Sequence, residues 1–170
     1  MGMSVTTSVA TEDDAERILK LQFLCYQGEA ELYGDWSIDP LTQTLDSMRS
    51  ELKEHHVLVA RLGDEIVGSV RGRVDDDGVG RIGRLMVHPR MQRHGLGSRL
   101  LRAMEQQLAA DGTVIVGYRL FTGHRSLGNL RLYQRLGYRQ TQVEEVNSKL
   151  SFIVLEKRTE PALDRFAAIA

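Results

Sequence analysis

The stretch VHPRMQRHGLG, residues 87–97, limits the possible folds of this chain most strongly. It carries the end of an apolar strand through a loop with two glycines into a helix whose apolar residues recur at steps of three and four. Gly95 and Gly97 remove side chains where a ligand would approach the backbone, and the first amides of a helix have no partner within it. Arg90, Arg93 and His94 add positive charge. The pattern predicts a phosphate or pyrophosphate site; the alternative is an ordinary strand-to-helix turn with basic side chains in solvent.

Two familiar phosphate loops are excluded by the same residues. No Gly-Lys-Ser/Thr follows the glycines, so this is not the P-loop of a nucleotide triphosphatase. The third glycine and the later acidic residue of a dinucleotide fingerprint are also missing.

Composition narrows the class of protein further. The 170 residues are 42% hydrophobic and 26% charged, which predicts one soluble domain over residues 1–170. A net charge of −1 gives no general attraction to polyanions, although arginines cluster between Arg81 and Arg102. A nucleic-acid binder using that cluster is a weaker alternative, because no run of aromatic residues accompanies it.

One cysteine, Cys25, excludes an intramolecular disulfide and favours a cytoplasmic location. No apolar run approaches the length of a membrane span.

The spacing of apolar residues and turn signals predicts a mixed sheet with helices on its faces. Thr11 is expected to cap the first helix, with Asp14 as the partner residue of a capping box. A hairpin turn is expected at Gly63-Asp64, and a helix end at Asp111-Gly112. The expected strands are 5–10, 56–62, 65–74, 80–88, 113–121, 138–146 and 149–157, and the expected helices are 11–32, 41–55, 96–110 and 126–136, with a loop at 34–40.

Two segments together resemble the GCN5-related N-acetyltransferase (GNAT) family. LMVHPRMQRHGLGSRLL is similar to the acetyl-CoA signature of that family, whose core is Arg/Gln-x-x-Gly-x-Gly/Ala. NLRLYQRLGYR, residues 129–139, resembles its Asn-x-x-x-Tyr-x-x-x-Gly-Phe/Tyr segment. The resemblance implies an α/β (α+β) fold, with a mixed, mostly antiparallel sheet of about seven strands, helices on both faces and a splayed central parallel pair.

The resemblance also implies where acetyl-CoA binds as the acetyl donor. Backbone groups of Leu85, Met86 and Val87 are expected to bond pantetheine, although simple core packing is the alternative for the side chains of Leu85 and Val87. Asn129 is expected to contact the arm of the cofactor. The pyrophosphate is expected on the loop amides of Gln92, Arg93, His94, Gly95, Leu96, Gly97 and Ser98.

Tyr133 is the expected general acid, which protonates the departing thiolate. Asn129 precedes it by four residues, so both side chains lie on one helix face. The alternative is a core tyrosine beside an asparagine at the start of a helix. His124, Arg125 and Ser126 are candidates for the nucleotide end of the cofactor, with an N-cap as the alternative for Ser126.

The sequence departs from the family where a general base is expected. The splayed strand at 80–88 offers Arg81, Gly83 and Arg84 but no carboxylate, and 113–121 has none either. A general base is therefore expected from elsewhere in the chain or acting through water, with CYQGEAELYGDW, residues 25–36, as the favoured source. Acceptor contacts are expected from the same segment, through Glu29, Glu31, Tyr33 and Asp35. The alternative is a solvated helix end and loop.

Metal or cysteine chemistry is not expected. His55-His56 lacks further ligands at metal spacing, and Cys25 falls on the apolar stripe of its helix. The resulting hypothesis is a cytoplasmic N-acetyltransferase acting on a primary amine of a small molecule or peptide, without nucleic-acid or membrane partners. The alternative is a weak or inactive sensor that binds coenzyme A. Homodimers are common in the family, and Leu163, Phe166 and Ile169 form an apolar tail face that suits one.

Overall fold

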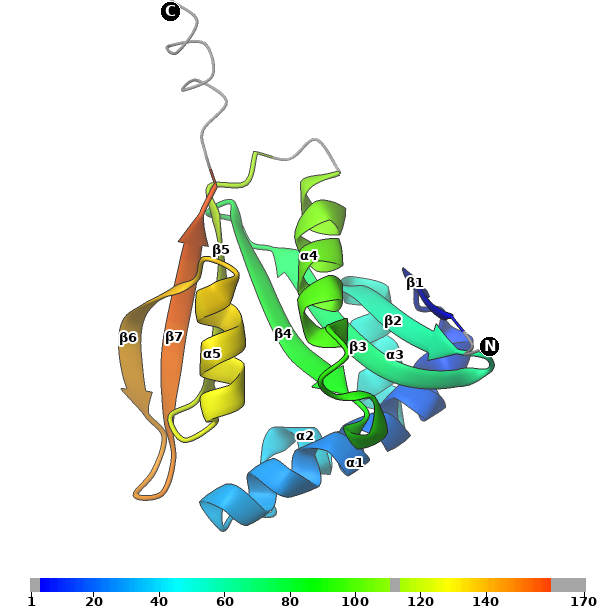
Figure 1. The fold of residues 1–170 in the computed structure, drawn as a ribbon, viewed down its shortest axis with the longest axis horizontal. Coiled ribbons are helices and arrows are strands. Elements are labelled where there is room, and N and C mark those ends of the chain that lie inside the picture. Colours follow the sequence, from blue (N-terminus) through cyan, green and yellow to red (C-terminus); the bar gives the residue numbers. More distant parts are fainter. Residues whose placement is uncertain (1–3, 111–113, 160–170) are drawn as a thin grey trace, which may run out of the picture.

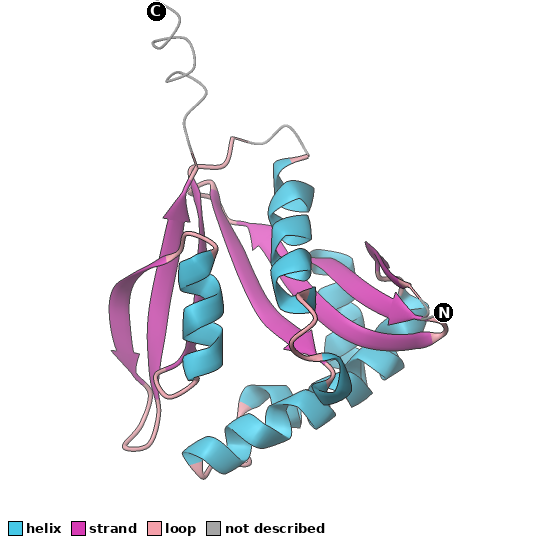
Figure 2. Cartoon of the chain, viewed as in Figure 1, coloured by secondary structure: helices cyan, strands magenta, loops and turns pink. Residues whose placement is uncertain are grey.

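A computed structural model describes residues 4–110 and 114–159 and contains one seven-stranded sheet (Figure 1, Figure 2). The strand order is β1-β2-β3-β4-β5-β7-β6, and every neighbouring pair is antiparallel except β4 and β5. The predicted mixed sheet with a central parallel pair is therefore confirmed. The strands are β1 Val5–Val9, β2 His56–Leu62, β3 Glu65–Val74, β4 Val79–Val87, β5 Gly117–Gly123, β6 Arg139–Glu145 and β7 Ser151–Arg158.

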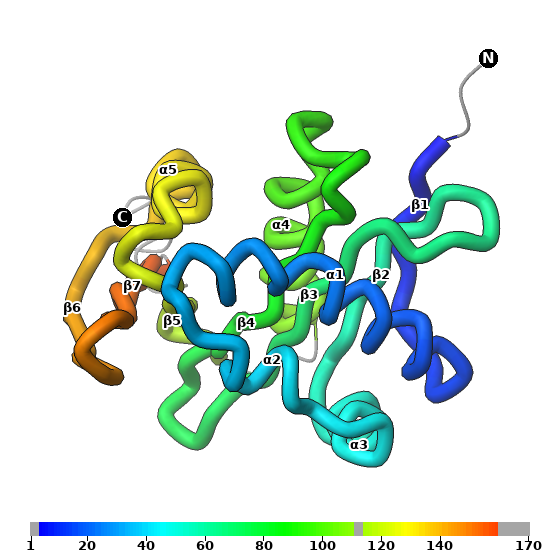
Figure 3. Tube along the Cα trace, turned by 90° about the horizontal axis from the view of Figure 1, so that it is seen from below, coloured from blue at the N-terminus to red at the C-terminus, as the bar shows by residue number. Residues whose placement is uncertain are grey.

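Helices cover both faces of the sheet, as predicted (Figure 3). α4 and α5 lie on one face, and α1, α2 and α3 lie on the other. Each face has an apolar core: Leu100 and Met104 of α4 belong to one, and Ile18 of α1 with Met48 of α3 belongs to the other. The helices are α1 Ala15–Tyr33, α2 Asp39–Thr42, α3 Leu45–Glu54, α4 Leu96–Ala109 and α5 Leu127–Arg135, with short 3₁₀ helices at Glu12–Asp14 and Pro89–Met91.

The first helix begins with the capping box expected from the sequence. The amide of Thr11 donates to Oδ2 of Asp14 at 2.9 Å, which satisfies a donor at the helix start. Arg61 of β2 donates to the same oxygen at 2.6 Å, so this carboxylate also joins the helix to the sheet. α1 ends at Gly34, whose φ of +63° suits glycine.

The predicted helix over 41–55 is wrong in its details, because the segment forms two helices. α2 begins at Asp39, inside the expected loop, with Pro40 in its first turn, where proline is tolerated. The chain is then extended at Gln43, and Thr44 caps α3 by accepting a hydrogen bond from the amide of Ser47 at 3.1 Å.

The strand predicted over 113–121 is shifted along the chain. Ladder pairing begins at Gly117, which lies between β4 and β7. Val114 and Val116 precede the strand and are 81% and 55% exposed, so their apolar character did not indicate burial. Residues 111–113, with the expected helix end, and the tail beyond 159, with its apolar face, lie outside the described residues.

β4 and β5 diverge after a short parallel ladder, and the candidate site lies where they separate. Only Val79, Gly80 and Arg81 pair with β5, at Gly117, Tyr118 and Arg119. β4 then carries a bulge, where its register against β3 shifts and Arg84 adopts a φ of +51°. Figure 1 shows the two strands separating towards α1.

Within the described residues, no helix is long and apolar enough to cross a membrane.

Candidate active site

A cavity of about 430 Å³ lies where β4 and β5 diverge. Its walls come from α1, the segment that leads into α2, both diverging strands, α5 and the turn between β6 and β7. Six of the residues predicted from the sequence line it: Glu29, Tyr33, Asp35, Leu85, Asn129 and Tyr133.

Tyr133 and Asn129 face this cavity from α5, on the shared face that their spacing predicts. The side chain of Tyr133 is buried, with 6% of it exposed, and burial raises its pKa well above the ordinary tyrosine value. Tyr133 therefore keeps its proton throughout the neutral range. Asn129 donates from Nδ2 to Oγ1 of Thr122 on β5 at 3.2 Å, which fixes the amide at the cavity wall.

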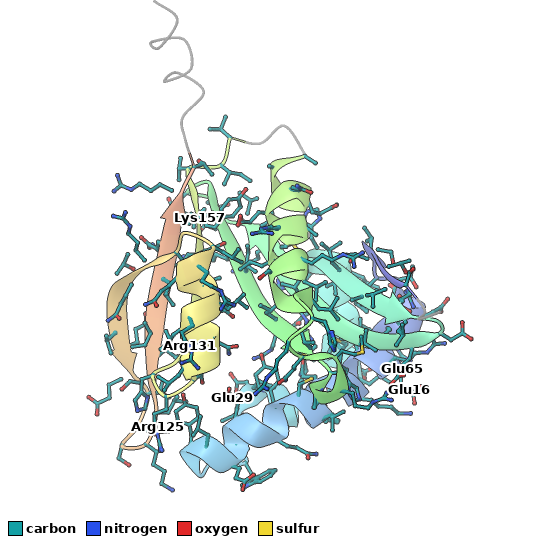
Figure 4. The ribbon with its side chains drawn as sticks, viewed as in Figure 1. Glu16, Glu29, Glu65, Arg125, Arg131 and Lys157 are labelled. Carbon is teal, nitrogen blue, oxygen red and sulfur yellow. The ribbon has the colours of Figure 1, made fainter. Side chains whose placement is uncertain are left out.

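Glu29 is held at the cavity by a chain of hydrogen bonds. Ser126 donates from Oγ to Oε2 of Glu29 at 2.8 Å, and the Tyr33 hydroxyl lies 2.9 Å from the same Oγ. The amide of Arg125 donates to the Tyr33 hydroxyl at 2.9 Å. Figure 4 shows Glu29 on α1 and Arg125 beside the start of α5. The negative charge of Glu29 adds to the effect of burial on the pKa of Tyr133, so the two groups are electrostatically coupled.

The loop before α4 has the geometry of an anion site. Gly95 has a φ of +78°, which strongly favours glycine, and Arg93 also lies in the left-handed region at +68°. Gly95 precedes the first helical residue, and the amide of Arg99 bonds back to its carbonyl at 3.1 Å. The amides of the first helical turn, at Leu96, Gly97 and Ser98, therefore lack intrahelical acceptors.

Not all of the exposed side chains around the loop before α4 are available to bind an anion. Arg90 pairs with Glu65 at 2.7 Å, so the positive charge expected from Arg90 is neutralised. Arg93 and His94 are exposed beside Gly95. Gln92 donates to the carbonyl of Val87 at 3.4 Å and ties the loop back to β4.

The end of β4 has one edge that no described strand pairs with, and on it only side chains, those of Cys25 and Gln92, bond the carbonyl of Val87. Met86 and Val87 pair with β3 on one side, whereas the ladder with β5 on the other side stops at Arg81. The side chains of Leu85 and Val87 pack against the α4 core, and Met86 is buried in the α1 core. Packing by the side chains and ligand pairing by the backbone are therefore compatible here.

Four other sequence candidates have different surroundings. Glu31 is exposed on α1 and does not line the cavity. Asp35 lines it, and hydrogen bonds from the hydroxyl and amide of Ser37 lower the pKa of its carboxyl. His124 accepts from the amide of Ser151 at 3.0 Å, and Arg125 donates to the carbonyl of Leu32 at 3.3 Å, so this loop holds the end of α1.

Most of the other residues that line the cavity were not among the sequence candidates, and Tyr26, Arg84 and Phe121 are the ones with a bearing on ligand binding. Tyr26 precedes Glu29 by three residues, so helical spacing could have indicated it. The guanidinium of Arg84 lies 5.9 Å from the centre of the Tyr26 ring.

Cys25 lies on α1 and contacts β4. Its Sγ donates to the carbonyl of Val87 at 3.5 Å, and burial raises its pKa to about 11. Across the described part of the chain, no group of three or more His, Cys, Asp or Glu side chains could hold a metal ion.

Solved acetyltransferase structures share this fold at low sequence identity. PaiA N-acetyltransferase from Thermoplasma acidophilum, in complex with coenzyme A, is 16% identical with a TM-score of 0.75, over 92% of this chain and 100% of that one. YncA from Salmonella typhimurium, with its cofactor acetyl-CoA, is 18% identical with a TM-score of 0.73, over 94% and 96%. The ribosomal-protein-S18-alanine N-acetyltransferase from Escherichia coli is 14% identical with a TM-score of 0.74, also over 94% and 96%.

The family assignment rests on a sequence model. None of the curated proteins compared matches this chain. The model of the acetyltransferase (GNAT) family matches residues 15–138, which include the cavity residues of α1, both diverging strands, the loop before α4 and Tyr133. The chain therefore belongs to the GNAT family of acetyltransferases.

Proposed function

We propose that the protein moves the acetyl group of acetyl-CoA directly to a primary amine of a small molecule or peptide. One observation supports this proposal above the others: Glu29 and Tyr133, a carboxylate and a protonated phenol, face the same cavity at the divergence of β4 and β5. A base and an acid at one site are what amine acylation by a thioester requires.

The residues around β4 and α4 suit acetyl-CoA. The amides from Gln92 to Ser98 would bond the pyrophosphate, and the edge of β4 at Leu85, Met86 and Val87, which no described strand pairs with, would bond the pantetheine. Asn129 lies beside Tyr133 and would contact the same arm. Two of the solved acetyltransferases contain coenzyme A or acetyl-CoA, which supports the same donor here.

Glu29 and Tyr133 would then divide the proton transfers. An amine attacks only in its neutral form, and Glu29, directly or through a water, accepts the proton that the amine loses. Tyr133 donates its proton to the sulfur as the carbon–sulfur bond breaks, so the leaving group departs as a thiol. Both substrates are bound together, and no side chain carries the acetyl group.

We further propose that this reaction takes place in the cytoplasm, since the chain carries one cysteine and that thiol is protonated. A homodimer is also proposed, as is common in the family.

Acetyl-CoA binding and amine acetylation are tested separately. We expect acetyl-CoA to raise the melting temperature, whereas NAD and ATP leave it unchanged. Gly97→Trp should abolish the shift, because even a Cβ at this position would lie 3.1 Å from Leu132 and a larger group would cover the loop amides. Thiol release with a panel of amines and short peptides, followed by mass spectrometry of the products, then measures transfer. Binding of acetyl-CoA without transfer to any amine would contradict the proposed activity.

A sensor that binds coenzyme A without turnover is the second candidate. It is favoured by the lack of any Asp or Glu on β4 and β5. In that case acetyl-CoA would stabilise the protein while the amine panel released no thiol.

A further inference from the structure

We propose that the acceptor carries a carboxylate next to its amino group and an apolar side chain, as a free α-amino acid does, and that Arg84 binds this carboxylate. This inference rests on the proposed amine acetylation and narrows its acceptor to one chemical class. It also distinguishes a free amino acid from the amino terminus of a peptide, where an amide replaces the carboxylate.

Among the described residues, Arg84 is a cation without an ionic partner, and it lines the cavity that contains Glu29 and Tyr133. It lies on the β4 bulge and is half-buried. Within residues 4–110 and 114–159 it has no hydrogen bond or ion pair, and its guanidinium lies 5.9 Å from the centre of the Tyr26 ring. A half-buried guanidinium keeps its charge, so the absence of a counter-ion favours an anionic ligand.

The backbone at Arg84 points to the same conclusion. Its φ of +51° lies in the left-handed region, which is costly for a residue with a side chain. The bulge that produces this conformation turns the residue out of the regular alternation of β4. Arg84 thus reaches a position that a regular strand would not give it, which is typical of functional sites.

A second hollow behind Arg84 extends the positive charge. It has a volume of about 190 Å³ and shares Ile82, Gly83, Arg84 and Phe121 with the larger cavity. Four arginines line it against one carboxylate, Glu51; the other three arginines are Arg71, Arg73 and Arg81.

The acidic residues nearby neutralise two of these four arginines. Arg71 pairs with Glu51, and Arg81 pairs with Asp75 at 2.8 Å. Arg73 and Arg84 have no such partner among the described residues. Arg71 is 4% exposed, and its Nε is buried without a hydrogen-bond partner in the described structure. The hollow therefore has excess positive charge, which favours an anion.

The cavity also holds a carboxylate, which suits the amino group. Glu29 and Tyr26 lie one helical turn apart on α1 and line the same cavity as Arg84. The Tyr26 ring, 5.9 Å from the Arg84 guanidinium, therefore lies near both charged groups. A molecule with an amine and a carboxylate can contact Glu29 and Arg84 at once.

One part of the cavity wall is apolar. Phe121 is 54% exposed, and the centre of its ring lies 4.7 Å from that of the half-buried Phe152 ring. Both line the cavity, together with Leu150 of the β6–β7 turn. A pair of aromatic rings beside a charged site is a surface on which an apolar side chain would pack.

The test compares acceptors that differ at the carboxylate alone. L-phenylalanine, L-phenylalaninamide and phenethylamine share the amine and the ring, but only the first has a carboxylate. Each is assayed by thiol release with the wild type, Arg84→Asn, Arg84→Lys and the control Arg139→Gln, an exposed arginine on β6. Asparagine tolerates a left-handed φ better than most residues, so Arg84→Asn removes the charge with little demand on the backbone. The amino groups of the amide and the acid differ in pKa, so their kcat/KM values are not compared with each other directly. For each acceptor, the kcat/KM of a variant is compared with that of the wild type.

We expect Arg84→Asn to lower kcat/KM for phenylalanine at least about tenfold and to change that for the amide and phenethylamine less than about twofold. Arg84→Lys should retain part of the preference for the acid, and Arg139→Gln all of it. An equal loss for all three acceptors in Arg84→Asn would overturn the inference while leaving amine acetylation intact.

A binding measurement keeps the two proposals separate. Titration calorimetry in the presence of coenzyme A compares N-acetyl-L-phenylalanine with N-acetyl-L-phenylalaninamide, and needs no turnover. Tighter binding of the acid that is lost in Arg84→Asn supports the anion site even if no amine is acetylated, in which case the proposed activity alone fails. Equal binding of the two compounds would overturn the anion site.

Discussion

The hydroxyl of Tyr33, at the end of α1, lies 2.9 Å from Oγ of Ser126, at the start of α5. Ser126 in turn bonds Glu29, so a contact between segments 93 residues apart holds the carboxylate at the cavity. The position of Glu29 therefore depends on how closely α1 approaches the end of β5.

Gly123 permits this approach, and its substitution is expected to disrupt the site. A Cβ on Gly123 would lie 2.1 Å from the Tyr33 oxygen and 2.5 Å from Cζ, so alanine must displace the Tyr33 ring and with it the contact to Ser126. We expect Gly123→Ala to lower the free energy of unfolding by about 1–3 kcal/mol and to reduce transfer sharply. Denaturant unfolding and thiol release measure the two effects. The control is Gly28→Ala on α1, where a Cβ meets no atom within 4 Å; it should raise stability by up to about 1 kcal/mol. Normal activity in Gly123→Ala would show that this contact does not matter.

Glu29→Gln keeps the shape of the side chain and removes its ability to accept a proton. We expect kcat to fall by about 100-fold or more near neutral pH, with acetyl-CoA affinity unchanged. The deficit should shrink as the pH rises towards the pKa of the acceptor amine, because the amine then needs no base. Steady-state kinetics over a range of pH give this profile. Glu16→Gln, at the exposed start of the same helix, is the matched control. A deficit that is constant with pH would contradict the role of base.

Tyr133→Phe removes the hydroxyl while retaining the ring in the core. Burial keeps the pKa of Tyr133 above the ordinary value, so its proton is present at all pH values up to at least about 10. The wild-type kcat should therefore show no decline from tyrosine ionisation between pH 7 and 10. We expect the variant to lose about 100-fold in kcat with stability nearly unchanged. Full activity in Tyr133→Phe would remove this residue from the mechanism.

The thiol of Cys25 is expected to be unreactive and to take no part in acetyl transfer. With a pKa of about 11, roughly one thiol in a thousand is ionised at pH 8. We therefore predict slow alkylation by iodoacetamide in the folded protein, full transfer in Cys25→Ala, and no acetylated protein after incubation with acetyl-CoA alone. Intact-mass spectrometry checks all the mass changes. An acetyl adduct on the wild type that is absent in Cys25→Ala would indicate a covalent route.

Asp14 is expected to contribute to stability above the pH at which it is protonated. Burial alone would raise the pKa of its carboxyl, but the hydrogen bonds from Arg61 and from the amide of Thr11 outweigh it and lower the pKa. A folded pKa below the unfolded one stabilises the protein fully above about pH 5, and this contribution is lost as the pH falls through the folded value. Asp14→Asn should cost about 2 kcal/mol at pH 7 and progressively less as the pH falls from about 5 through the folded pKa, measured by denaturant unfolding. Asp46→Asn, whose side chain is 96% exposed, should change little at any pH.

The order and type of the elements were predictable because their signals are local. The glycine loop before α4, the hairpin at Gly63-Asp64 and the spacing that places Asn129 and Tyr133 on one face each depend on neighbouring residues only. The resemblance in two segments then indicated the sheet topology, which local signals alone do not give.

The acceptor side was less predictable because it is built from distant contacts. Ser126 at the start of α5 could be a helix cap, and nothing near it in the sequence indicates that its hydroxyl bonds Glu29 instead. Arginine is not a residue that suggests a positive φ, so the bulge at Arg84 had no local signal. The start of β5 was misplaced because Val114 and Val116 are apolar yet exposed, and strand pairing with β7 decides where the strand begins.

Because the ladder between β4 and β5 is short, the rate at which the protein is degraded should depend on whether its ligand is bound. Among the described residues, three parallel pairs at one end of these strands provide the hydrogen bonds between the two halves of the sheet. A donor bound across the open end would add backbone bonds to the native state that the unfolded chain cannot form, and so would stabilise it by mass action. Protection of the β4 and β5 amides from hydrogen exchange should then rise with acetyl-CoA concentration. We therefore expect the molecule to open more often at this seam when acetyl-CoA is scarce, so that a protease that cuts open forms would remove it sooner.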